Sequence, residues 1–476
     1  MNAKNYLSFF AALLLLACSK QITPVRTPTT SAEAYVNQYL TRPDRSALFA
    51  RQPALSFSQN GLGVLPLIDI RQDSVYQTID GFGYTLSGGS AGHLLQMTPA
   101  ARATLLRELF DTTGNSIGIS YLRLSIGASD LNAKVFSYND LPAGETDPQM
   151  QRFDLGPDRQ DMIPVLKEIL AINPGIKLMA SPWSPPAWMK TNGDTRGGSL
   201  KPEWYDAYAR YLVRYVQEMQ KEGIRIDAIT VQNEPLHPGN NPSLLMPASE
   251  QAAFIKQSLG PQFRAAGLNT RIIIYDHNAD RPDYPISILN DPAAKQYIDG
   301  SAFHLYAGPI SALSEVKAAH PDKHLYFTEQ WTGAPGKFAE DLQWHVATLT
   351  IGATRNWARC VLEWNLTSNP QLTPFTDRGG CSSCLGGITI DGDRVMRNSG
   401  YYVVAHASRY VRPGSVRVGS NTIQDVPNVA FRTPAGKLVL IAVNTGAAAK
   451  QFAVRSGSKS FVASLDPGSV GTFVWE

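Results

Sequence analysis

The feature that most constrains the fold is a regular alternation of short apolar runs with amphipathic stretches between residues 78 and 401. The clearest amphipathic stretch spans 202–219, where Trp204, Tyr208, Leu212 and Met219 recur at helical spacing and Gly223 follows. Eight strand-helix units over this length predict an α/β fold, a (β/α)₈ barrel. The eight runs are 78–82, 119–124, 176–181, 228–232, 272–275, 301–306, 325–328 and 360–364.

The sequence pattern changes after residue 401, where short β-prone runs are separated by Gly, Pro, Asn or Ser. This pattern predicts an accessory antiparallel β-sandwich, to which the β-prone segment 63–76 ahead of the barrel adds strands. We therefore expect a signal peptide at 1–17, a lipidated tether at 18–59 and N-terminal sandwich strands at 60–78. The barrel is expected at 79–400 and the C-terminal sandwich at 401–476.

The N-terminus has the form of an export signal. Lys4 precedes an apolar run over 6–16, which is too short for an ordinary transmembrane helix and ends in Leu-Leu-Ala-Cys at Cys18. This ending resembles the bacterial lipoprotein box, in which Cys18 becomes the lipidated first residue of the mature chain. The alternative is a plain secretory signal. We expect a protein that touches the membrane through its lipid anchor only, with the membrane face left open.

Three further cysteines are Cys360, Cys381 and Cys384. A Cys-x-x-Cys pair is compatible with a zinc half-site or a redox motif, but no second pair and no thioredoxin-like context accompany this one. Because disulfides persist in exported proteins, we predict a loop-closing disulfide between Cys381 and Cys384. Cys360 lies in an apolar run and is predicted to be a buried, inert thiol.

Charge and composition narrow the range of partners. Charged residues make up 17% of the chain, the net charge is +3, and no long basic run occurs, which argues against a nucleic-acid partner. No metal cluster, phosphate loop or cofactor motif is visible, so we expect no cofactor and no metal. We also expect a monomer.

Two glutamates carry the chemical signal. Glu234 follows the fourth apolar run in Asn-Glu-Pro, and Glu329 ends the seventh in Phe-Thr-Glu. A charge at the end of an apolar strand is costly unless it is paired or used, and barrel enzymes place their chemistry at strand ends. Glycoside cleavage needs a proton donor and a second carboxylate, which in retaining enzymes attacks the sugar from ~5–5.5 Å away. Asn233 beside Glu234 suits a hydrogen bond to a sugar 2-hydroxyl.

Several segments together make the chain resemble glycoside hydrolase family 30, the group that contains lysosomal glucosylceramidase and microbial β-1,6-glucanases. The most specific is Ser-Pro-Trp-Ser-Pro-Pro-Ala-Trp-Met-Lys-Thr-Asn-Gly at 181–193. The family's barrel with a sandwich built from both chain ends agrees with the expected architecture. The other segments are Asp-Gly-Phe-Gly at 80–83, Arg-Leu-Ser at 123–125, Ser-Asp at 129–130, Asn-Glu-Pro at 233–235, His-Leu-Tyr at 304–306, Phe-Thr-Glu at 327–329 and Trp-Asn-Leu at 364–366.

The resemblance implies roles for single residues. Glu234 would be the catalytic acid/base and Glu329 the nucleophile. Arg123 would hold Glu329 ionised, and His304 and Tyr306 would border it. The remaining residues would bind substrate. Asp130 and Trp183 would hydrogen-bond the outer hydroxyls of the sugar, and Trp364 would form an apolar wall. The alternatives are a barrel-interior ion pair for Arg123, ordinary core for Trp364 and a satisfied buried histidine for His304.

The chain also departs from the lysosomal members. Tyr84 and Thr85 follow Gly-Phe-Gly, and the loop at 376–387, which would shape the aglycone side, differs. The favoured function is endo-hydrolysis of β-1,6-glucan. The alternatives are an exo-acting β-glucosidase or glucosylceramidase-like enzyme and a non-catalytic carbohydrate-binding lipoprotein. A xylan-specific relative fits less well, because Asp130 and Trp183 suit a 6-hydroxylated sugar.

Overall fold

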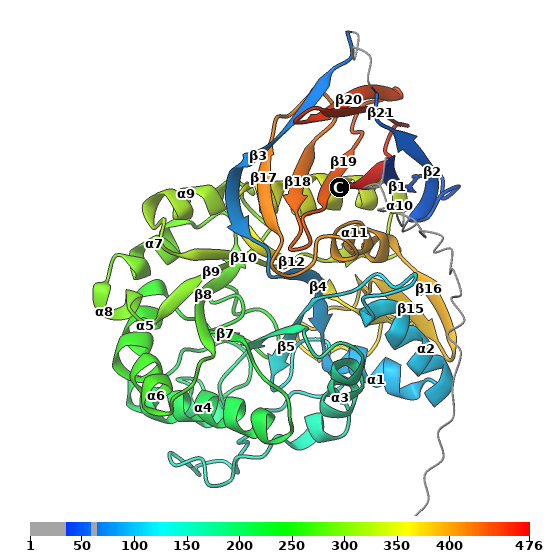
Figure 1. Ribbon diagram of the computed structural model, residues 1–476. Coiled ribbons are helices and arrows are strands. Elements are labelled where there is room, and N and C mark those ends of the chain that lie inside the picture. The colour runs from blue at the N-terminus through cyan, green and yellow to red at the C-terminus, as the bar shows by residue number, and fades with distance from the viewer. Residues whose placement is uncertain (1–34, 59–63) are drawn as a thin grey trace, which may run out of the picture.

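The computed structural model describes residues 35–58 and 64–476. Figure 1 shows a large barrel ringed by helices and, next to it, a smaller β-sheet unit that both described ends of the chain enter. The predicted signal peptide and Cys18 lie outside the described residues. Within those residues, no helix has the length and apolar character needed to cross a membrane.

The predicted (β/α)₈ barrel is confirmed. Eight parallel strands close in the order β10-β12-β4-β5-β6-β7-β8-β9, and each overlaps one of the eight predicted apolar runs or lies directly beside it. The strands are β4 (Gly81–Leu86), β5 (Tyr121–Ile126), β6 (Lys177–Pro182), β7 (Ala228–Thr230), β8 (Arg271–Asn278), β9 (Ile298–His304), β10 (His324–Glu329) and β12 (Ala358–Asn365).

Helices cover the outside of the barrel. The predicted helix at 202–219 is present as a 3₁₀ turn, η3 (Pro202–Trp204), that continues into α4, whose apolar face is buried. The α-helices are α1 (Gly88–Gln96), α2 (Pro99–Phe110), α3 (Met162–Ile172), α4 (Tyr205–Lys221), α5 (Ala248–Phe254), α6 (Gly260–Ala265), α7 (Asp283–Leu289), α8 (Pro292–Lys295), α9 (Ala312–Ala319), α10 (Phe338–Trp344) and α11 (Ser399–Ser408). The π-helical segments are η4 (Ile255–Leu259) and η5 (His345–Ala353), and two further 3₁₀ turns are η1 (Gly156–Arg159) and η2 (Ala187–Met189).

The barrel interior has two layers: an apolar lower layer towards the amino-terminal ends of the strands and a polar upper layer at their carboxyl ends. Seven of the eight strands contribute to a buried cluster that fills the lower layer, and the free thiol of Cys360 is one member. This filling makes the barrel a packed core and leaves the carboxyl ends of the strands for polar side chains. The cluster consists of Tyr121, Met179, Ala228, Ile273, Ala302, Tyr326, Cys360 and Leu362.

The second unit is a nine-stranded sheet in the order β2-β1-β22-β19-β18-β17-β3-β20-β21. All its pairs are antiparallel except β3 with β20. It folds back on itself, since Ser58 beyond β2 hydrogen-bonds Ser460 of β21, and it buries its own apolar cluster. The strands are β1 (Tyr35–Thr41), β2 (Ala50–Ser56), β3 (Leu67–Thr78), β17 (Val416–Ser420), β18 (Asn428–Arg432), β19 (Leu438–Val443), β20 (Lys450–Ser456), β21 (Lys459–Leu465) and β22 (Val470–Trp475).

Two expected boundaries need correction. The tether was expected to run to residue 59, but β1 and β2 already belong to the sheet, where β1 pairs with β22. That pairing joins the two ends of the chain, so local composition does not reveal it. The sandwich was expected from residue 401, but α11 spans that boundary and packs on the barrel and on η5.

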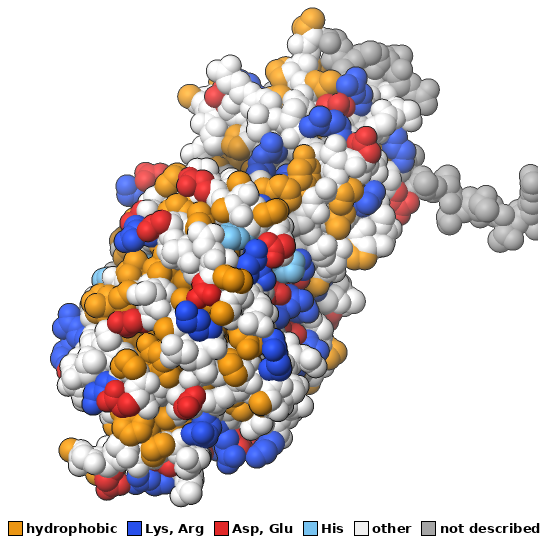
Figure 2. Space-filling model, turned by 90° about the vertical axis from the view of Figure 1, so that its left-hand side faces the viewer, with side chains coloured by type: hydrophobic (Ala, Val, Ile, Leu, Met, Phe, Trp, Pro, Cys, Tyr) orange, Lys and Arg blue, Asp and Glu red, His pale blue; other side chains and the backbone are white. Residues whose placement is uncertain are grey.

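On the face shown in Figure 2, basic and acidic side chains are interspersed with small apolar patches. Such a mixed surface is typical of globular proteins that do not rely on one strongly charged face.

His406 of α11 ties the barrel to both ends of the chain. Its Nδ1 lies 2.9 Å from Thr472 Oγ1 of β22, and its Nε2 lies 2.8 Å from Thr41 Oγ1 of β1. Thr472 donates its hydroxyl proton to the His406 carbonyl, so it must accept a hydrogen bond from Nδ1–H. Burial lowers the pKa of His406 to about 3. The ring is therefore neutral, with Nε2 accepting from Thr41.

We predict that His406 makes the protein less stable in acid. The pKa of His406 is about 3 in the folded protein, against an ordinary value of 6.5. Between these two pH values the unfolded chain binds a proton that the folded chain does not, so the free energy of unfolding decreases as the pH is lowered. At pH 5 this costs about 2 kcal/mol. The stability gap between wild type and His406→Gln, measured by urea unfolding, should therefore shrink by about 2 kcal/mol between pH 8 and pH 5. A gap that stays constant would contradict the assignment.

Candidate active site

A cavity of about 470 Å³ opens at the carboxyl ends of the barrel strands. This is the end at which barrel enzymes carry their chemistry. Its lining brings together most of the residues singled out from the sequence. The lining residues are Asp130, Trp183, Asn233, Glu234, His237, Asn240, His277, Asn278, Tyr306, Glu329, Trp331, Trp364 and 379–384.

Glu234 and Glu329 face each other in this cavity. Glu329 is the last residue of β10, whereas Glu234 lies beyond β7 with a left-handed backbone (φ +44°), and its N–H donates to the Asp276 carbonyl. One oxygen of each carboxylate and a ring nitrogen of His304 lie within 4.8 Å of one another. The two strand ends therefore converge on one small volume, as a two-carboxylate mechanism requires.

Arg123 of β5 connects the polar groups beneath the carboxylates. Its guanidinium is sealed from solvent and donates to Glu329 Oε2 at 2.7 Å, Asp276 Oδ2 at 2.8 Å and Asn233 Oδ1 at 2.6 Å. Its Nε–H donates to Ser181, and its charge lies 4.8 Å from the ring centre of Trp183. Every side of the cation is thus occupied by an acceptor or an aromatic face.

Asp276 is a site residue that the sequence analysis missed. It is fully buried and accepts hydrogen bonds from Arg123, Thr230, His304 and Thr328. Although burial alone would raise the pKa of its carboxyl, Arg123 and His304 hold that pKa well below its usual range. Asp276 has φ +68° at a bulge in β8 that aims it inward. One signal was present in the sequence: an acid directly after an apolar run.

His304, at the end of β9, lies between the two carboxylates. Its Nδ1 is 3.2 Å from Glu234 Oε1 and 3.6 Å from Glu329 Oε1, and its Nε2 is 3.1 Å from Asp276 Oδ1. Carboxylates only accept, so both ring nitrogens donate and the ring is protonated. Burial opposes this charge, but the surrounding carboxylates, Glu329 foremost, raise the pKa of His304 to about 9.

The two glutamates differ in their partners. Glu329 accepts from Arg123 and, at 2.9 Å, from the hydroxyl of Tyr306. Burial raises the pKa of Glu329, and the charges of His304 and Arg123 partly offset that rise. For Glu234, burial is outweighed by the hydrogen bond and charge of His304, which lower its pKa. Because Glu234, Glu329 and His304 interact closely, their protonation changes are coupled to one another.

The inner end of the cavity is shaped for a small polar ligand. The rings of Trp183 and Trp364 lie 5.5 Å apart and form an aromatic wall. Asp130 is buried, and within the described residues its Oδ1 has no hydrogen-bond partner. Burial, with the charges of Glu329 and Glu234, raises the pKa of Asp130 to about 8. An unpartnered carboxyl in the cavity that these tryptophans also line is a ready site for a ligand hydroxyl.

A disulfide-closed loop forms another wall. Cys381 and Cys384 are bonded, with their Cα atoms 5.7 Å apart, and Cys384 belongs to a short strand, β14 (Cys384–Leu385), that pairs with β11 (Thr332–Gly333). The loop is also tied to its neighbours, because Asn241 donates to Asp377 and Arg378 pairs with Asp194. The remaining short strands, β13 (Thr367–Ser368), β15 (Ile388–Asp391) and β16 (Arg394–Arg397), form a small sheet in the same insertion.

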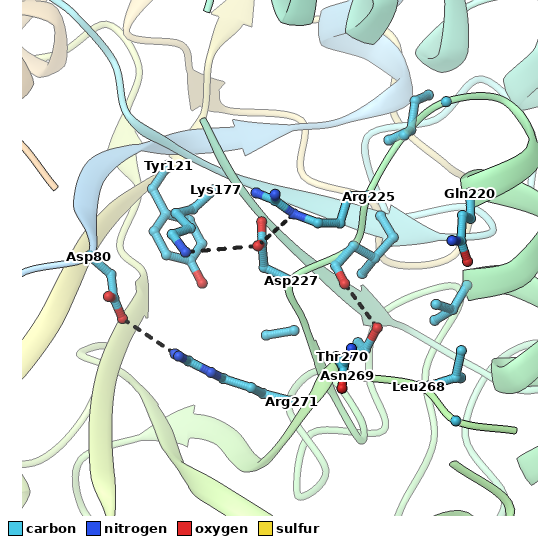
Figure 3. Close-up of a pocket in the computed structure, with 16 residues that line it drawn as sticks. Asp80, Tyr121, Lys177, Gln220, Arg225, Asp227, Leu268, Asn269, Thr270 and Arg271 are labelled. Atoms are coloured by element: carbon cyan, nitrogen blue, oxygen red, sulfur yellow. Dashed lines mark hydrogen bonds and ion pairs between the residues drawn. The ribbon is translucent and has the colours of Figure 1, made fainter. Parts of the chain in front are cut away.

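A second cavity, of about 570 Å³, lies at the opposite, amino-terminal end of the barrel (Figure 3). Asp227 pairs there with Arg225 at 2.9 Å and Lys177 at 3.8 Å, and Arg271 approaches Asp80 at 3.8 Å. Each charged side chain that lines this cavity thus has an opposite partner. That pattern suits a stabilising barrel floor better than a reaction site.

Glu234, His304 and Glu329 are close enough to one another to be considered as metal ligands. A metal ligand must be a deprotonated ring nitrogen, however, and His304 uses both of its nitrogens as donors to carboxylates. The donor set therefore favours a proton at this position over a metal ion.

Comparison with known proteins identifies both units. The model of the glycosyl hydrolase family 30 TIM-barrel domain matches residues 79–411, and that of the family 30 beta sandwich domain matches 414–473. The endo-1,6-beta-D-glucanase neg1 of Aspergillus fumigatus is 33% identical over 395 residues, covering 78% of this chain and 79% of the relative. The lysosomal acid glucosylceramidase of Mus musculus is 27% identical, covering 89% and 85%.

Among solved structures, the endo-beta1,6-glucanase BT3312 superimposes with a TM-score of 0.86 at 35% identity. The match covers 93% of this chain and 99% of that one.

We predict that Asp276→Asn lowers the pKa of His304 by about one unit or more, because a neighbouring carboxylate charge is removed. NMR titration of ¹³C-labelled histidine, with the His304 signal assigned by its absence from His304→Gln, measures this directly. Thr328→Val is the matched control, since it deletes one hydrogen bond to Asp276 but no charge. An unchanged His304 pKa in Asp276→Asn would contradict the electrostatic coupling.

Proposed function

The chain belongs to glycoside hydrolase family 30 and is an O-glycosyl hydrolase, and we propose that it is a retaining endo-β-1,6-glucanase acting on extracellular glucan. The observation that carries the proposal is the pair Glu234 and Glu329, whose nearest oxygens lie within 4.8 Å. Retaining enzymes hold their carboxylates ~5–5.5 Å apart, and inverting enzymes ~6.5–9.5 Å.

In the first step Glu329 attacks the anomeric carbon while Glu234 protonates the glycosidic oxygen, so that the leaving glucan departs with its electron pair and a new proton. In the second step Glu234 takes a proton from water, which displaces Glu329 and restores the anomeric configuration. The donors Arg123 and Tyr306 stabilise the anionic form of Glu329 before and after its bond to the sugar.

The proton that Glu234 delivers is held on the Glu234–His304 pair. In the free enzyme it resides on Nδ1 of His304, 3.2 Å from Glu234 Oε1. Transfer along this hydrogen bond gives a neutral imidazole and a protonated Glu234 without changing the total charge. The pair therefore keeps one transferable proton across neutral pH.

The innermost glucosyl unit would sit between Glu329 and the wall of Trp183 and Trp364, where the unpartnered Oδ1 of Asp130 would accept an outer hydroxyl. Asn233 gives its carbonyl oxygen to Arg123, which leaves its amide N–H₂ for the sugar 2-hydroxyl. A hydrogen bond there that strengthens in the transition state supplies several kcal/mol.

The linkage is proposed from β-1,6-glucanases that the chain resembles, two of which are described above. The similarity to a glucosylceramidase supports a second candidate, a glucosyl-lipid hydrolase or exo-acting β-glucosidase. The non-catalytic alternative is not supported, since both carboxylates are in place. Digestion of pustulan, gentiobiose and glucosylceramide discriminates: early gentio-oligosaccharides from pustulan indicate endo action, whereas glucose alone or lipid turnover favours the second candidate.

We also propose that the protein is exported and anchored through acylated Cys18. The Leu-Leu-Ala-Cys ending supports this, and a tethered enzyme suits a polymer supplied from outside the cell. Two or more acyl chains are enough for stable anchoring.

We predict that Glu329→Gln lowers kcat/KM by ~10⁴-fold or more, because the covalent path is lost while substrate positioning remains. Initial rates on an aryl β-glucoside and on pustulan measure the loss. Glu315→Gln on α9, an exposed glutamate outside the cavity, is the control and should keep wild-type rates. A modest loss in Glu329→Gln would remove it as the nucleophile.

We predict that Glu234→Gln still forms the glucosyl-enzyme from an aryl glucoside, because a good leaving group needs little proton donation. Deglycosylation should be slow without a base, and added azide should restore turnover and give a β-glucosyl azide. NMR of the product identifies the anomer. Rescue of Glu329→Gln to a β-azide instead would mean that the two roles are reversed.

We predict that the mature protein begins at an acylated Cys18. Mass spectrometry of the N-terminal peptide from the membrane fraction should show the mass of a lipid-modified cysteine. Cys18→Ser should lose this modification and leave the membrane fraction. A mature N-terminus at another, unmodified residue would reject the anchor.

A further inference from the structure

His277 is a buried polar side chain that no partner within the described residues satisfies. It is 6% exposed, and its Nδ1 is closed off without a hydrogen-bond partner. Burial lowers the pKa of His277 to about 4, so that the imidazole is neutral at neutral pH and has one N–H and one accepting nitrogen. Leaving a buried polar group without a partner costs stability, so the packing of the barrel alone does not account for His277.

His277 borders the active-site cavity. It follows Asp276 directly in β8, beyond the bulge, and its side chain lines the active-site cavity. Nδ1 is sealed from solvent whereas Nε2 is not, so the ring edge that borders the cavity is the one that carries Nε2. This edge is available to a bound ligand in the free enzyme.

Two neighbouring residues, Asn278 and His237, also present polar groups to the cavity. Asn278 lines the cavity, and its Oδ1 accepts from the Tyr306 backbone N–H at 2.9 Å, which leaves its amide N–H₂ free to donate. His237 also lines the cavity, and its backbone N–H donates to the Glu234 carbonyl. The wall next to Glu234 therefore presents imidazole and amide groups rather than apolar side chains.

This wall lies on the leaving-group side. The proton donor has to reach the glycosidic oxygen, so the groups close to Glu234 are the ones near what is cleaved off. His277 and His237 are both close enough to Glu234 to act on its charge. The innermost sugar occupies the other part of the cavity, beside Asp130 and the two tryptophans.

We propose that His277, with Asn278, forms a leaving-group subsite that hydrogen-bonds the hydroxyls of a sugar unit on the cleaved side of the bond. The chemical class of leaving group is therefore a carbohydrate, with which a neutral imidazole and an amide form complementary hydrogen bonds, and not an acyl lipid. This inference rests on the proposed hydrolysis of β-glucosidic bonds and adds a residue that selects the leaving group.

The test compares two leaving groups in the full-length protein. Wild type and His277→Ala are assayed for kcat/KM on gentiotriose, which releases a sugar, and on 4-nitrophenyl β-glucoside, which releases an aryl group without sugar hydroxyls. His277→Ala should lower kcat/KM ~10–100-fold on gentiotriose and less than about threefold on the aryl glucoside. Only the leaving group of gentiotriose has a sugar hydroxyl whose hydrogen bond the variant removes. Asn278→Ala should show the same selectivity.

Two further variants separate binding from folding. His277→Gln retains a donor and an acceptor and should recover part of the gentiotriose activity. His320→Ala, a buried histidine at the end of α9 and outside the cavity, should affect both substrates equally or neither. Unfolding temperatures and aryl-glucoside rates show whether each variant is folded.

Equal losses on both substrates would overturn the proposal, because His277 would then act only by positioning Glu234. Unchanged gentiotriose activity in His277→Ala would overturn it as well. Failure of the proposed function has a different signature: the wild type itself would leave gentiotriose intact. In that case cellobiose and laminaribiose replace it, and the same variant comparison decides the leaving-group subsite.

Discussion

The buried guanidinium of Arg123 is the constraint on which the rest of the site depends. A cation without solvent inside a barrel is tolerated only when anions and acceptors surround it, and removing one partner of such a pair costs ~3–5 kcal/mol. Asp276 and Glu329 supply the charges, and Asn233 and Ser181 the neutral acceptors. The same contacts set the orientation of Glu329 and Asn233, so the group that satisfies Arg123 is also the group that faces the ligand.

Alternating negative and positive charges connect Arg123 to the carboxylate of Glu234. Asp276 shares its two oxygens between Arg123 and His304, and His304 in turn donates to Glu234. Three carboxylates thus surround two cations in one buried layer of the barrel. The arrangement holds Glu234 and Glu329 close together despite their like charges, and it stores the proton that one of them has to deliver.

The accessory sheet contributes to this precision indirectly. Strands from both ends of the chain meet in β1 and β22, and the neutral ring of His406 joins both to helix α11. Helix α11 packs on the barrel strand β4, and the hydroxyl of Tyr84 in β4 donates to the Gly400 carbonyl. The sheet is therefore bonded to the barrel wall and is not a loosely attached module.

The sequence by itself determined the eight barrel strands, the α4 helix and the two catalytic glutamate candidates, because apolar periodicity and strand-end charges are local properties. It also predicted a bond between Cys381 and Cys384, which are only three residues apart. Only the tertiary structure decided that β1 and β2 join the sheet, that Asp276 joins the buried polar groups beneath the carboxylates and that His277 lines the cavity. The first depends on a partner strand at the far end of the chain, and the second on a bulge in β8 that changes which way its side chains point. Neither long-range pairing nor a bulge has a signature in the residues that undergo it.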